Sequence, residues 1–599
     1  MTKLLLTGDE AVARGAWEAG VRFASAYPGT PSTEILENLS HMKGVHAEWA
    51  PNEKVALEGA IGASIAGGRA ICSMKHVGMN VAADPMFTFA YTGVNGGAVI
   101  VTADEPGMYS SQNEQDNRNY AKAAKLPMLE PSDSQECLDM TRLAFELSEQ
   151  YDIPVILRLT TRVCHSKSVV QVGERQEPPL REYGRRIDKY VCVPAVARKR
   201  RVDLAQRLEA LAHFSENTDL NRAEMRATRV GVICSGVCYY YCREVFGEDA
   251  SYLKLGFTNP LPAAKISDFC AAVDKLYVVE ENDPYLEEFV RQLGFAPSGK
   301  QLFPSWDEMT PDVLRRCLNG CELPHPDYDA SLVVGRPPTL CAGCPHRGFF
   351  YEISRRKNVM ISGDIGCYTL GSAQPFGAMD ATVCMGASLS MGHGAQIIFN
   401  QARQESRTER ATRVVSVLGD STFFHSGITS LLNVAYNKSD TVNVILDNRI
   451  TGMTGHQENP GSGYTAMGEE AYAVDIEQLV RTLGFKHVAC IDPNNIAQVR
   501  QTLDEFLALD EPSVIITRWP CALKKFSKED KAEFAQAYHH KYRVDKDKCI
   551  GCRLCMKAGC PALSFDPEPG KARVAGDQCL GCGVCSQICP KAAIVKEGE

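Results

Sequence analysis

Eight cysteines near the carboxy terminus are spaced for metal chemistry. The first run is C-I-G-C-R-L-C followed by Cys560-Pro561, and the second is C-L-G-C-G-V-C-S-Q-I-C-P. A C-x2-C-x2-C loop can direct three thiolates at one four-iron cluster, while the cysteine before proline completes the neighbouring cluster. The pattern therefore predicts two [4Fe-4S] clusters. One is assigned Cys549, Cys552, Cys555 and Cys589, and the other Cys579, Cys582, Cys585 and Cys560.

This cysteine-rich tail resembles a bacterial-type two-cluster ferredoxin. It departs from that pattern in one detail, because four residues rather than three separate Cys555 from Cys560. We expect the loop beside that cluster to be enlarged. Structural zinc is the alternative use of grouped cysteines. Two triple-cysteine runs that each close on Cys-Pro disfavour zinc.

A second group of residues could hold a diphosphate. The strand-like run V-V-S-V-L leads into Gly419-Asp420-Ser421, a helix is expected at about 425–436, and a second strand ends at Asp447-Asn448. Parallel neighbours finish at the same sheet edge, so Asp420 and Asn448 should converge. Carboxylate and amide oxygens suit magnesium that holds a diphosphate. A Gly-Asp pair alone is as often only a turn.

The elements that must position these residues indicate an α/β protein. Strand-like runs at 229–234, 276–279, 413–418 and 442–446 alternate with helical stretches, which is typical of parallel sheets. The 599 residues allow about four domains. We expect three doubly wound domains ahead of the cysteine-rich tail.

Composition excludes several classes of function. A net charge of -9 gives no basic field for nucleic acid. The longest apolar stretches, such as residues 96–102, are too short to span a membrane. The amino terminus lacks a signal-peptide layout. Together with 24 cysteines in a long chain, these features predict a cytoplasmic protein in a reducing, oxygen-poor compartment.

Two stretches are expected to be linkers because their composition turns charged and irregular. The first covers about 175–228 and includes the basic run at 198–201, and the second covers about 524–548. The basic run could dock an acidic electron carrier, but a solvated helix end is the favoured interpretation.

The diphosphate motif carries a family resemblance. G-D-S at Gly419, followed by D-N-R-I-T-G-M-T-G-H from Asp447, resembles the thiamine-diphosphate motif of the 2-oxoacid:ferredoxin oxidoreductases. The resemblance implies that Asp420, the Asn448 side chain and the Ile450 carbonyl bind Mg²⁺. The residues implied to lie along the cofactor are Gly419, Ser421, Thr451, Gly452 and Thr454.

The same family carries a further cluster beside thiamine. The cysteines that match its order and rough spacing are Cys341, Cys344, Cys367 and Cys521. The resemblance implies a third, proximal [4Fe-4S] cluster that collects electrons where they are released. Cys341 and Cys344 could instead be a reduced pair or a zinc half-site, and Cys521 a buried thiol. His346 either donates a hydrogen bond to the cofactor or is structural.

The amino-terminal region resembles the pyrimidine-binding domain of these oxidoreductases. Thiamine chemistry needs a carboxylate at the aminopyrimidine ring in a fairly dry pocket. Asn52-Glu53 precedes a helix of small residues, and the resemblance gives Glu53 this catalytic position, whereas Glu58 is expected on the surface. A-Y-P-G-T-P-S-T resembles the family's Y-P-I-T-P loop, which implies that Thr30 bonds the substrate. Gly29 departs from that pattern, and either enlarges the pocket or supplies a turn with positive φ.

Two further segments resemble one branch of the family, the alpha subunits of indolepyruvate (arylpyruvate) ferredoxin oxidoreductases. They are S-M-K-H-V-G-M-N from Ser73 and S-S-Q-N-E-Q-D-N-R from Ser110. Lys75, His76 and Gln112 are pocket candidates without a role. The resemblance implies oxidative decarboxylation of an aryl 2-oxoacid to an aryl-acetyl-CoA, with coenzyme A as cosubstrate. Electrons would pass through the clusters to an external ferredoxin.

The resemblance also implies the division of the chain. The expected parts are a pyrimidine-binding domain at 1–175, a linker at 176–227, a transketolase carboxy-terminal-like domain at 228–325, a diphosphate-binding domain at 330–525 and the ferredoxin domain at 540–599. A separate beta subunit is expected to carry the family's gamma-type domain, in an α2β2 assembly. Three alternatives remain: another 2-oxoacid such as pyruvate, a non-oxidative thiamine-dependent decarboxylase, and an electron-transfer protein with a vestigial thiamine fold.

Overall fold

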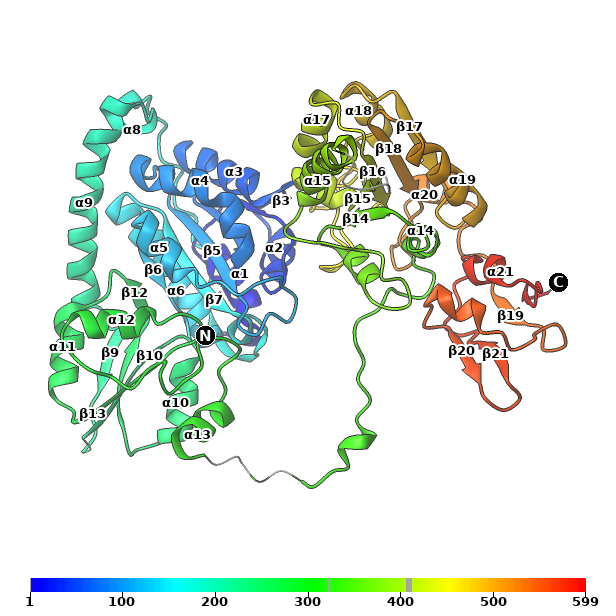
Figure 1. Cartoon of the computed structure of the whole chain (residues 1–599). Coiled ribbons are helices and arrows are strands. Elements are labelled where there is room, and N and C mark those ends of the chain that lie inside the picture. The colour runs from blue at the N-terminus through cyan, green and yellow to red at the C-terminus, as the bar shows by residue number, and fades with distance from the viewer. Residues whose placement is uncertain (1, 228, 321–323, 325, 406–411, 599) are drawn as a thin grey trace. The chain divides into compact units, whose positions relative to one another are not determined.

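The computed structural model describes residues 2–227, 229–320, 324, 326–405 and 412–598 (Figure 1). The chain forms two compact units, Met1–Tyr328 and Asp329–Glu599. The expected domain boundaries at 228 and 325 fall outside the described residues. No described helix is long and apolar enough to cross a membrane.

The first unit is built on a seven-stranded sheet. Its order is β12-β6-β7-β5-β4-β2-β3, and every neighbouring pair is parallel except β12 with β6. The central strand β5 is buried along its whole length, as in a sheet covered on both faces by helices. The strands are β2 (Phe23–Ala26), β3 (His46–Trp49), β4 (Ala70–Lys75), β5 (Ala98–Asp104), β6 (Met128–Leu129), β7 (Val155–Thr160) and β12 (Phe257–Asn259).

The carboxyl ends of β2 and β3 place the expected catalytic residues at one edge of this sheet. Thr30 follows β2, and Glu53 begins helix α3 (Glu53–Ile65) shortly after β3. Helix α3 starts there because the Asn52 side chain accepts a hydrogen bond from the Val55 backbone N–H and caps the helix. Helix α4 (His76–Thr92) follows β4 at the same edge.

The first unit contains a second, four-stranded sheet. Its order is β13-β10-β11-β9, with β9 antiparallel to the other strands. These strands are β9 (Asn221–Glu224), β10 (Val230–Ser235), β11 (Ser251–Leu255) and β13 (Lys275–Val279).

Residues 176–227, expected as a linker, are largely structured. They contain α8 (Ile187–Tyr190), α9 (Pro194–Asn217) and β9, and Leu204 and Leu211 of α9 join the core of the seven-stranded sheet. The basic run at 198–201 lies on α9, where Arg200 is buried and pairs with Asp152 while its three basic neighbours are exposed. The composition is charged because most of α9 faces solvent, not because the segment lacks structure.

The second unit contains a five-stranded parallel sheet in the order β14-β15-β16-β18-β17. After β15 the chain is helical without a break from Asp420 to Tyr436, so the helix expected at about 425–436 begins five residues earlier. The strands are β14 (Val359–Ser362), β15 (Arg413–Gly419), β16 (Val442–Asp447), β17 (His487–Ile491) and β18 (Ser513–Arg518). The helical segments are α16 (Asp420–Thr422), the π-helix η3 (Phe423–Gly427) and α17 (Ile428–Tyr436). The parallel sheets of both units confirm the predicted α/β class.

The carboxy-terminal tail forms two small two-stranded antiparallel sheets, with short helices beside its cysteines. Phe350, Val444, Cys549 and Ile588 belong to one hydrophobic core, so the tail packs onto the five-stranded sheet domain. The elements of the tail are β19 (Tyr542–Val544) with β22 (Ile594–Lys596), β20 (Leu563–Asp566) with β21 (Lys571–Val574), the 3₁₀ helix η4 (Leu554–Ala558) and α21 (Val584–Ile588).

Candidate functional site

Asp420 and Asn448 lie at the carboxyl edge of the five-stranded sheet. β15 and β16 are parallel neighbours with Gly419 opposite Leu446, so the residues that follow the two strands emerge side by side. Asp420 opens α16 directly after β15, and Asn448 follows β16. Both side chains are buried. The structure thus brings together the two side chains that were expected to bind the metal.

The electrostatics of Asp420 fit a cation. Burial, and after it the neighbouring Asp447 carboxylate, raise the pKa of Asp420 to about 7. Asp447 pairs with Arg518 at 2.9 Å, whereas no ion pair among the described residues includes Asp420. Asn459 Nδ2 donates to Asp420 Oδ2 at 3.2 Å. A buried carboxylate without a counter-charge is costly, and Mg²⁺ at this position would supply the missing charge.

Two hydroxyls join the segments on either side of this edge. Thr451 Oγ1 donates to Ser421 Oγ at 2.9 Å, and the Ile450 backbone N–H donates to Asn448 Oδ1 at 3.3 Å. Thr454 bonds Gln457 through its hydroxyl. The segment after β16 is therefore hydrogen-bonded to α16 through Thr451 and Ser421. Sequence reasoning missed Asn459, because the surrounding E-N-P-G run indicates only a turn.

Two glycines bring the backbone close to neighbouring side chains here. A β-carbon on Gly419 would lie 2.6 Å from Cε1 of Tyr368. A β-carbon on Gly452 would lie 3.6 Å from Cys367 Sγ and 3.7 Å from Asn448 Nδ2. Cys367 therefore adjoins the loop that is expected to follow the diphosphate.

Four cysteines, which we call the proximal set, lie within electrostatic range of one another beside this loop. Burial, and after it the neighbouring thiols of Cys521 and Cys341, raise the pKa of Cys367 to about 12. The Cys521 backbone N–H donates to the Asn448 carbonyl at 3.0 Å, which fixes this cysteine beside the metal-site loop. The proximal set is Cys341, Cys344, Cys367 and Cys521.

His346 lies in an aromatic environment at the start of α14 (His346–Ile353). Its ring centroid is 6.4 Å from that of Phe350 and 6.3 Å from that of Tyr368, both edge-on. Burial lowers the pKa of His346 to about 4, so the imidazole is neutral near pH 7. A neutral ring keeps one N–H donor, which is compatible with either expected role.

The tail cysteines form two further sets, as their assignment by spacing proposed. Cys549, Cys552, Cys555 and Cys589 line one cavity, and we call them the Cys549 set. The thiols of Cys582, Cys560 and Cys579 act together on the pKa of Cys585, which burial raises first. We call Cys560, Cys579, Cys582 and Cys585 the Cys560 set.

The spacing of all three sets argues against zinc. A tetrahedral zinc site with Zn–S bonds of about 2.3 Å holds its sulfurs roughly 3.8 Å apart. In the part of the chain that the structure describes, the one group of three or more ligand atoms within 4.8 Å of one another is Asp9, Glu34 and His165. The cysteine sets are therefore more open than zinc sites, as a larger cluster requires.

Glu53 sits at the amino terminus of α3 in the first unit, where it is 5% exposed. A β-carbon on Gly78 of α4 would lie 2.6 Å from its Oε1 atom, so α4 packs directly on the carboxylate. Glu58 is exposed and pairs with Lys54, as expected for the surface glutamate. The dry surroundings of Glu53 match the requirement for a proton-holding carboxylate.

Neither expectation for Gly29 is correct. Gly29 is not among the residues with positive φ, and a β-carbon there would lie 3.2 Å from Cγ of Lys75. The room beside Gly29 is filled by the Lys75 stem and does not enlarge a pocket. Thr30, the next residue, is half-buried and begins a cis Thr30–Pro31 bond.

The two signature segments contact each other in the first unit. Lys75 Nζ lies 3.6 Å from Glu105 Oε2 and donates to the Ser110 carbonyl at 3.3 Å. His76 is buried with Nε2 3.0 Å from the Asn113 carbonyl, and Gln112 is exposed. These contacts order the segment from Ser110 over the end of β4.

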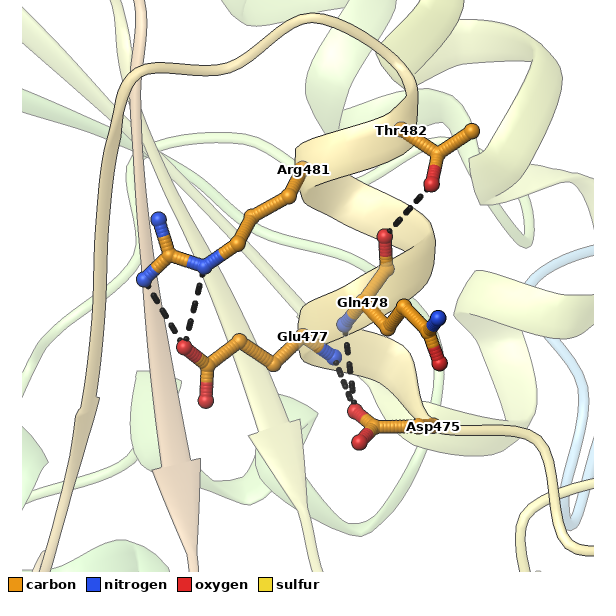
Figure 2. Close-up of a pocket in the computed structure, with 5 residues that line it drawn as sticks. All are labelled: Asp475, Glu477, Gln478, Arg481 and Thr482. Carbon is orange, nitrogen blue, oxygen red and sulfur yellow. Dashed lines mark hydrogen bonds and ion pairs between the residues drawn. The ribbon is translucent and has the colours of Figure 1, made fainter.

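A surface pocket on helix α18 (Ile476–Thr482) is not part of this site (Figure 2). Arg481 pairs with Glu477 of the same helix at 2.8 Å and donates to the Val488 carbonyl of β17 at 3.2 Å. Asp475 caps the helix through the backbone N–H groups of Glu477 and Gln478. None of the expected site residues lines it.

Three parts of the chain match known families. Residues 14–201 match pyruvate flavodoxin/ferredoxin oxidoreductase, thiamine diphosphate-binding. Residues 364–517 match the thiamine pyrophosphate enzyme carboxy-terminal TPP-binding domain. Residues 541–590 match a 4Fe-4S dicluster domain. The chain therefore has thiamine-diphosphate-binding domains and a dicluster domain.

Relatives match over the whole chain. "Indolepyruvate oxidoreductase subunit IorA" of Archaeoglobus fulgidus is 40% identical over 99% of this chain and 97% of its own length. The protein of the same name from Methanothermobacter marburgensis is 40% identical over 100% of this chain and 98% of its own. A solved 2-oxoglutarate:ferredoxin oxidoreductase from Magnetococcus marinus aligns with a TM-score of 0.45 and 19% identity, over 52% of this chain and 64% of that one.

Proposed function

We propose a function from one premise: the chain belongs to the family of indolepyruvate oxidoreductase subunits IorA. The protein oxidatively decarboxylates aryl 2-oxoacids of the indolepyruvate and phenylpyruvate type. Substrate and coenzyme A become an aryl-acetyl-CoA, carbon dioxide and a proton. The two electrons released pass singly through iron-sulfur clusters to an external ferredoxin.

The observation that carries this proposal is the position of Cys367 against the diphosphate loop. Its Sγ lies next to Gly452, and the Cys521 backbone N–H is hydrogen-bonded to the Asn448 carbonyl of the same loop. A decarboxylase that only protonates its intermediate needs no electron acceptor here. A cluster on the proximal set, Cys341, Cys344, Cys367 and Cys521, would accept electrons beside the cofactor.

Bound thiamine diphosphate supplies the carbanion stabilisation that decarboxylation requires. Asp420, the Asn448 side chain and the Ile450 carbonyl hold Mg²⁺. Glu53 holds the proton at the aminopyrimidine ring. The residues along the diphosphate are Gly419, Ser421, Thr451, Gly452 and Thr454.

Three further roles belong to this proposal. Thr30 bonds the substrate. His346 remains neutral and orients the cofactor or its surroundings. The Cys560 set and the Cys549 set carry electrons outward.

Electrons leave the protein from the Cys549 set. Cys552 and Ile550, which follows Cys549, are exposed, and Ile550 retains 61% of its accessible surface. Exposed lysines flank these residues at Lys546, Lys548 and Lys591. A basic rim around an exposed cluster suits an acidic carrier such as ferredoxin.

A separate beta subunit completes the enzyme, and we propose an α2β2 assembly in a reducing cytoplasm. The relatives are named as subunits, which supports a partner chain. Reducing surroundings preserve thiolate-bound clusters.

The test is an anaerobic assay of the reconstituted complex with indolepyruvate, phenylpyruvate and pyruvate, using coenzyme A and a viologen acceptor. Arylpyruvates should give the higher kcat/KM, with acyl-CoA and reduced viologen formed in a ratio of one to two. A preference for pyruvate would overturn the substrate assignment. Aldehyde formation without viologen reduction would indicate the non-oxidative decarboxylase.

A further inference from the structure

Arg347 connects two cysteine-bearing segments through its buried guanidinium group. It lies on α14 and is 1% exposed. Nη2 donates to the carbonyls of Leu340 and Cys341, and Nη1 donates to those of Ala558 at 2.8 Å and Gly559 at 2.5 Å. The first two carbonyls belong to the loop of the proximal set, and the last two directly precede Cys560.

The loops on either side of Arg347 are in contact. A β-carbon on Gly343 would lie 2.9 Å from Cβ of Leu580, which stands between Cys579 and Cys582. Tyr538 Oη donates to the Gly343 carbonyl at 3.1 Å and to the Pro520 carbonyl at 2.9 Å. The Cys560 set, and not the Cys549 set, is therefore the neighbour of the proximal set.

The enlarged loop between Cys555 and Cys560 forms part of this junction. Gly559 has a φ of 58°, in the left-handed region that favours glycine. A β-carbon there would lie 2.7 Å from Cδ of Pro375. This loop therefore packs against the sheet domain and presents two carbonyls to Arg347.

The charge of Arg347 has no carboxylate partner. Its four acceptors are neutral carbonyls, and no ion pair among the described residues includes it. Its Nε–H is also buried without a hydrogen-bond partner in the described part of the chain. A buried unpaired charge is destabilising unless an anion lies nearby.

Thiolate-bound clusters on both sides would supply that anion. The Arg347 backbone N–H donates to the carbonyl of Cys344, in the proximal set, at 3.3 Å. Its guanidinium donates to the two carbonyls that directly precede Cys560, in the Cys560 set. Arg347 thus lies beside both cluster positions.

We propose that Arg347 sets the reduction potentials of the two clusters it separates and so governs the electron step between them. The inference rests on the proposed function. Each cluster gains one negative charge on reduction, so a fixed positive charge stabilises the reduced state and raises the midpoint potential. In the step itself one electron leaves the proximal cluster and reduces the cluster of the Cys560 set. No bond or proton changes place.

The experiment compares Arg347→Gln, Arg347→Met and Arg347→Lys in the anaerobic complex with its partner subunit. Arg413→Gln is the matched control, because Arg413 is a half-buried arginine at the other end of β15 that pairs with Asp440. Iron content is measured first, and each cluster is then followed by redox titration with electron paramagnetic resonance.

The neutral variants should lower the midpoint potentials of two clusters and leave the third unchanged. Arg347→Lys should restore most of the shift, and Arg413→Gln should change none. Unshifted potentials at full iron content, or an equal shift of all three clusters, would overturn the proposal. If Arg347→Gln and Arg347→Met both lose the iron of the two clusters while Arg347→Lys keeps it, that result supports the need for a positive charge at this position. Loss of iron from Arg347→Lys as well would make Arg347 only a docking residue.

Failure of the proposed function is separable from this result. The wild-type complex should contain about twelve iron atoms per chain, from three four-iron clusters. A content of about eight iron atoms would mean that the proximal cluster is absent and that its proposed role is wrong. If the wild-type complex contains all three clusters, the shifts of potential in the variants test the role of Arg347 and not the proposed function.

Discussion

Gly78 of α4 lies directly against the carboxylate of Glu53, where a β-carbon would come within 2.6 Å of Oε1 and 2.7 Å of Cγ. Such a contact leaves no room for any other residue without moving the carboxylate.

Gly78→Ala should displace Glu53 and lower kcat about 100-fold, because a shift of about 1 Å in a catalytic group has that order of effect. The control is Gly62→Ala in α3, whose β-carbon would meet nothing within 4 Å. That change should keep full activity and stabilise the helix by about 0.5–1 kcal/mol. Steady-state kinetics and thermal unfolding give both values. Equal activity in the two variants would contradict the contact.

Glu53→Gln should lower kcat by about 10²- to 10⁴-fold, since a neutral amide cannot hold the proton at the cofactor ring. Glu58→Gln, an exposed residue one turn further along α3, should behave as the wild type. Cofactor affinity is measured in parallel by calorimetry. A loss confined to the Glu58 variant would show that the catalytic carboxylate has been misassigned.

Asp420→Asn should weaken Mg²⁺-dependent binding of thiamine diphosphate by at least about tenfold, because a charged metal ligand is lost. The same change should raise the melting temperature of the cofactor-free chain, since it removes a buried carboxylate that has no counter-charge. Calorimetry with and without Mg²⁺ and thermal scans test the two effects. A lower melting temperature would mean that Asp420 is stabilising without the metal.

Glu281→Gln should stabilise the first unit at alkaline pH. Burial raises the pKa of Glu281 from 4.5 to about 7. The folded state therefore retains a proton that the unfolded state loses between these values, and the free energy of unfolding falls as pH rises through this window. The full effect is on the order of 3 kcal/mol. Thermal scans should show a higher melting temperature for the variant at pH 8 and little difference at pH 4.5.

The neighbouring Glu280 provides a contrast. It accepts from Arg118 at 2.8 Å inside the core. Glu280→Gln should therefore lower the melting temperature at both pH values, because it leaves a buried arginine underpaired. A pH-independent gain in the Glu281 variant would contradict the titration.

Lys591→Glu should slow the reduction of ferredoxin several-fold at low salt while reduction of a viologen dye stays unchanged. Lys591 is exposed and lines the cavity of the Cys549 set, so reversing its charge opposes the approach of an acidic carrier. Lys438→Glu, at the end of α17, is the control. Equal rates with ferredoxin in both variants would move the exit site elsewhere.

Much of the architecture could be predicted because strand ends carry local signals. The runs at 413–418 and 442–446 became β15 and β16 within one residue, and their parallel pairing brings Asp420 next to Asn448. Cysteine spacing likewise grouped Cys549, Cys552, Cys555 and Cys589, which line one cavity. These features depend on short-range patterns and on a general rule about sheet edges.

Other features depend on contacts between distant segments, which no local pattern encodes. Gly29, which follows β2, indicated extra space, but the side chain of Lys75 at the end of the neighbouring strand β4 fills it. Asn459 and Arg347 gave no signal, since their roles come from the carboxylate and the carbonyls that the fold brings to them. Leu204 and Leu211 of α9 lie in the core, but two leucines are too few to stand out in a segment of charged composition.

Because its loop between Cys555 and Cys560 has one extra residue, the ferredoxin-like tail is hard to replace with another ferredoxin domain. A donor ferredoxin with the shorter spacing could be grafted onto this chain and still load its own iron. Its loop would not present the two carbonyls that Arg347 binds in this chain. The grafted domain would fold, but electrons would pass to it poorly from the proximal cluster.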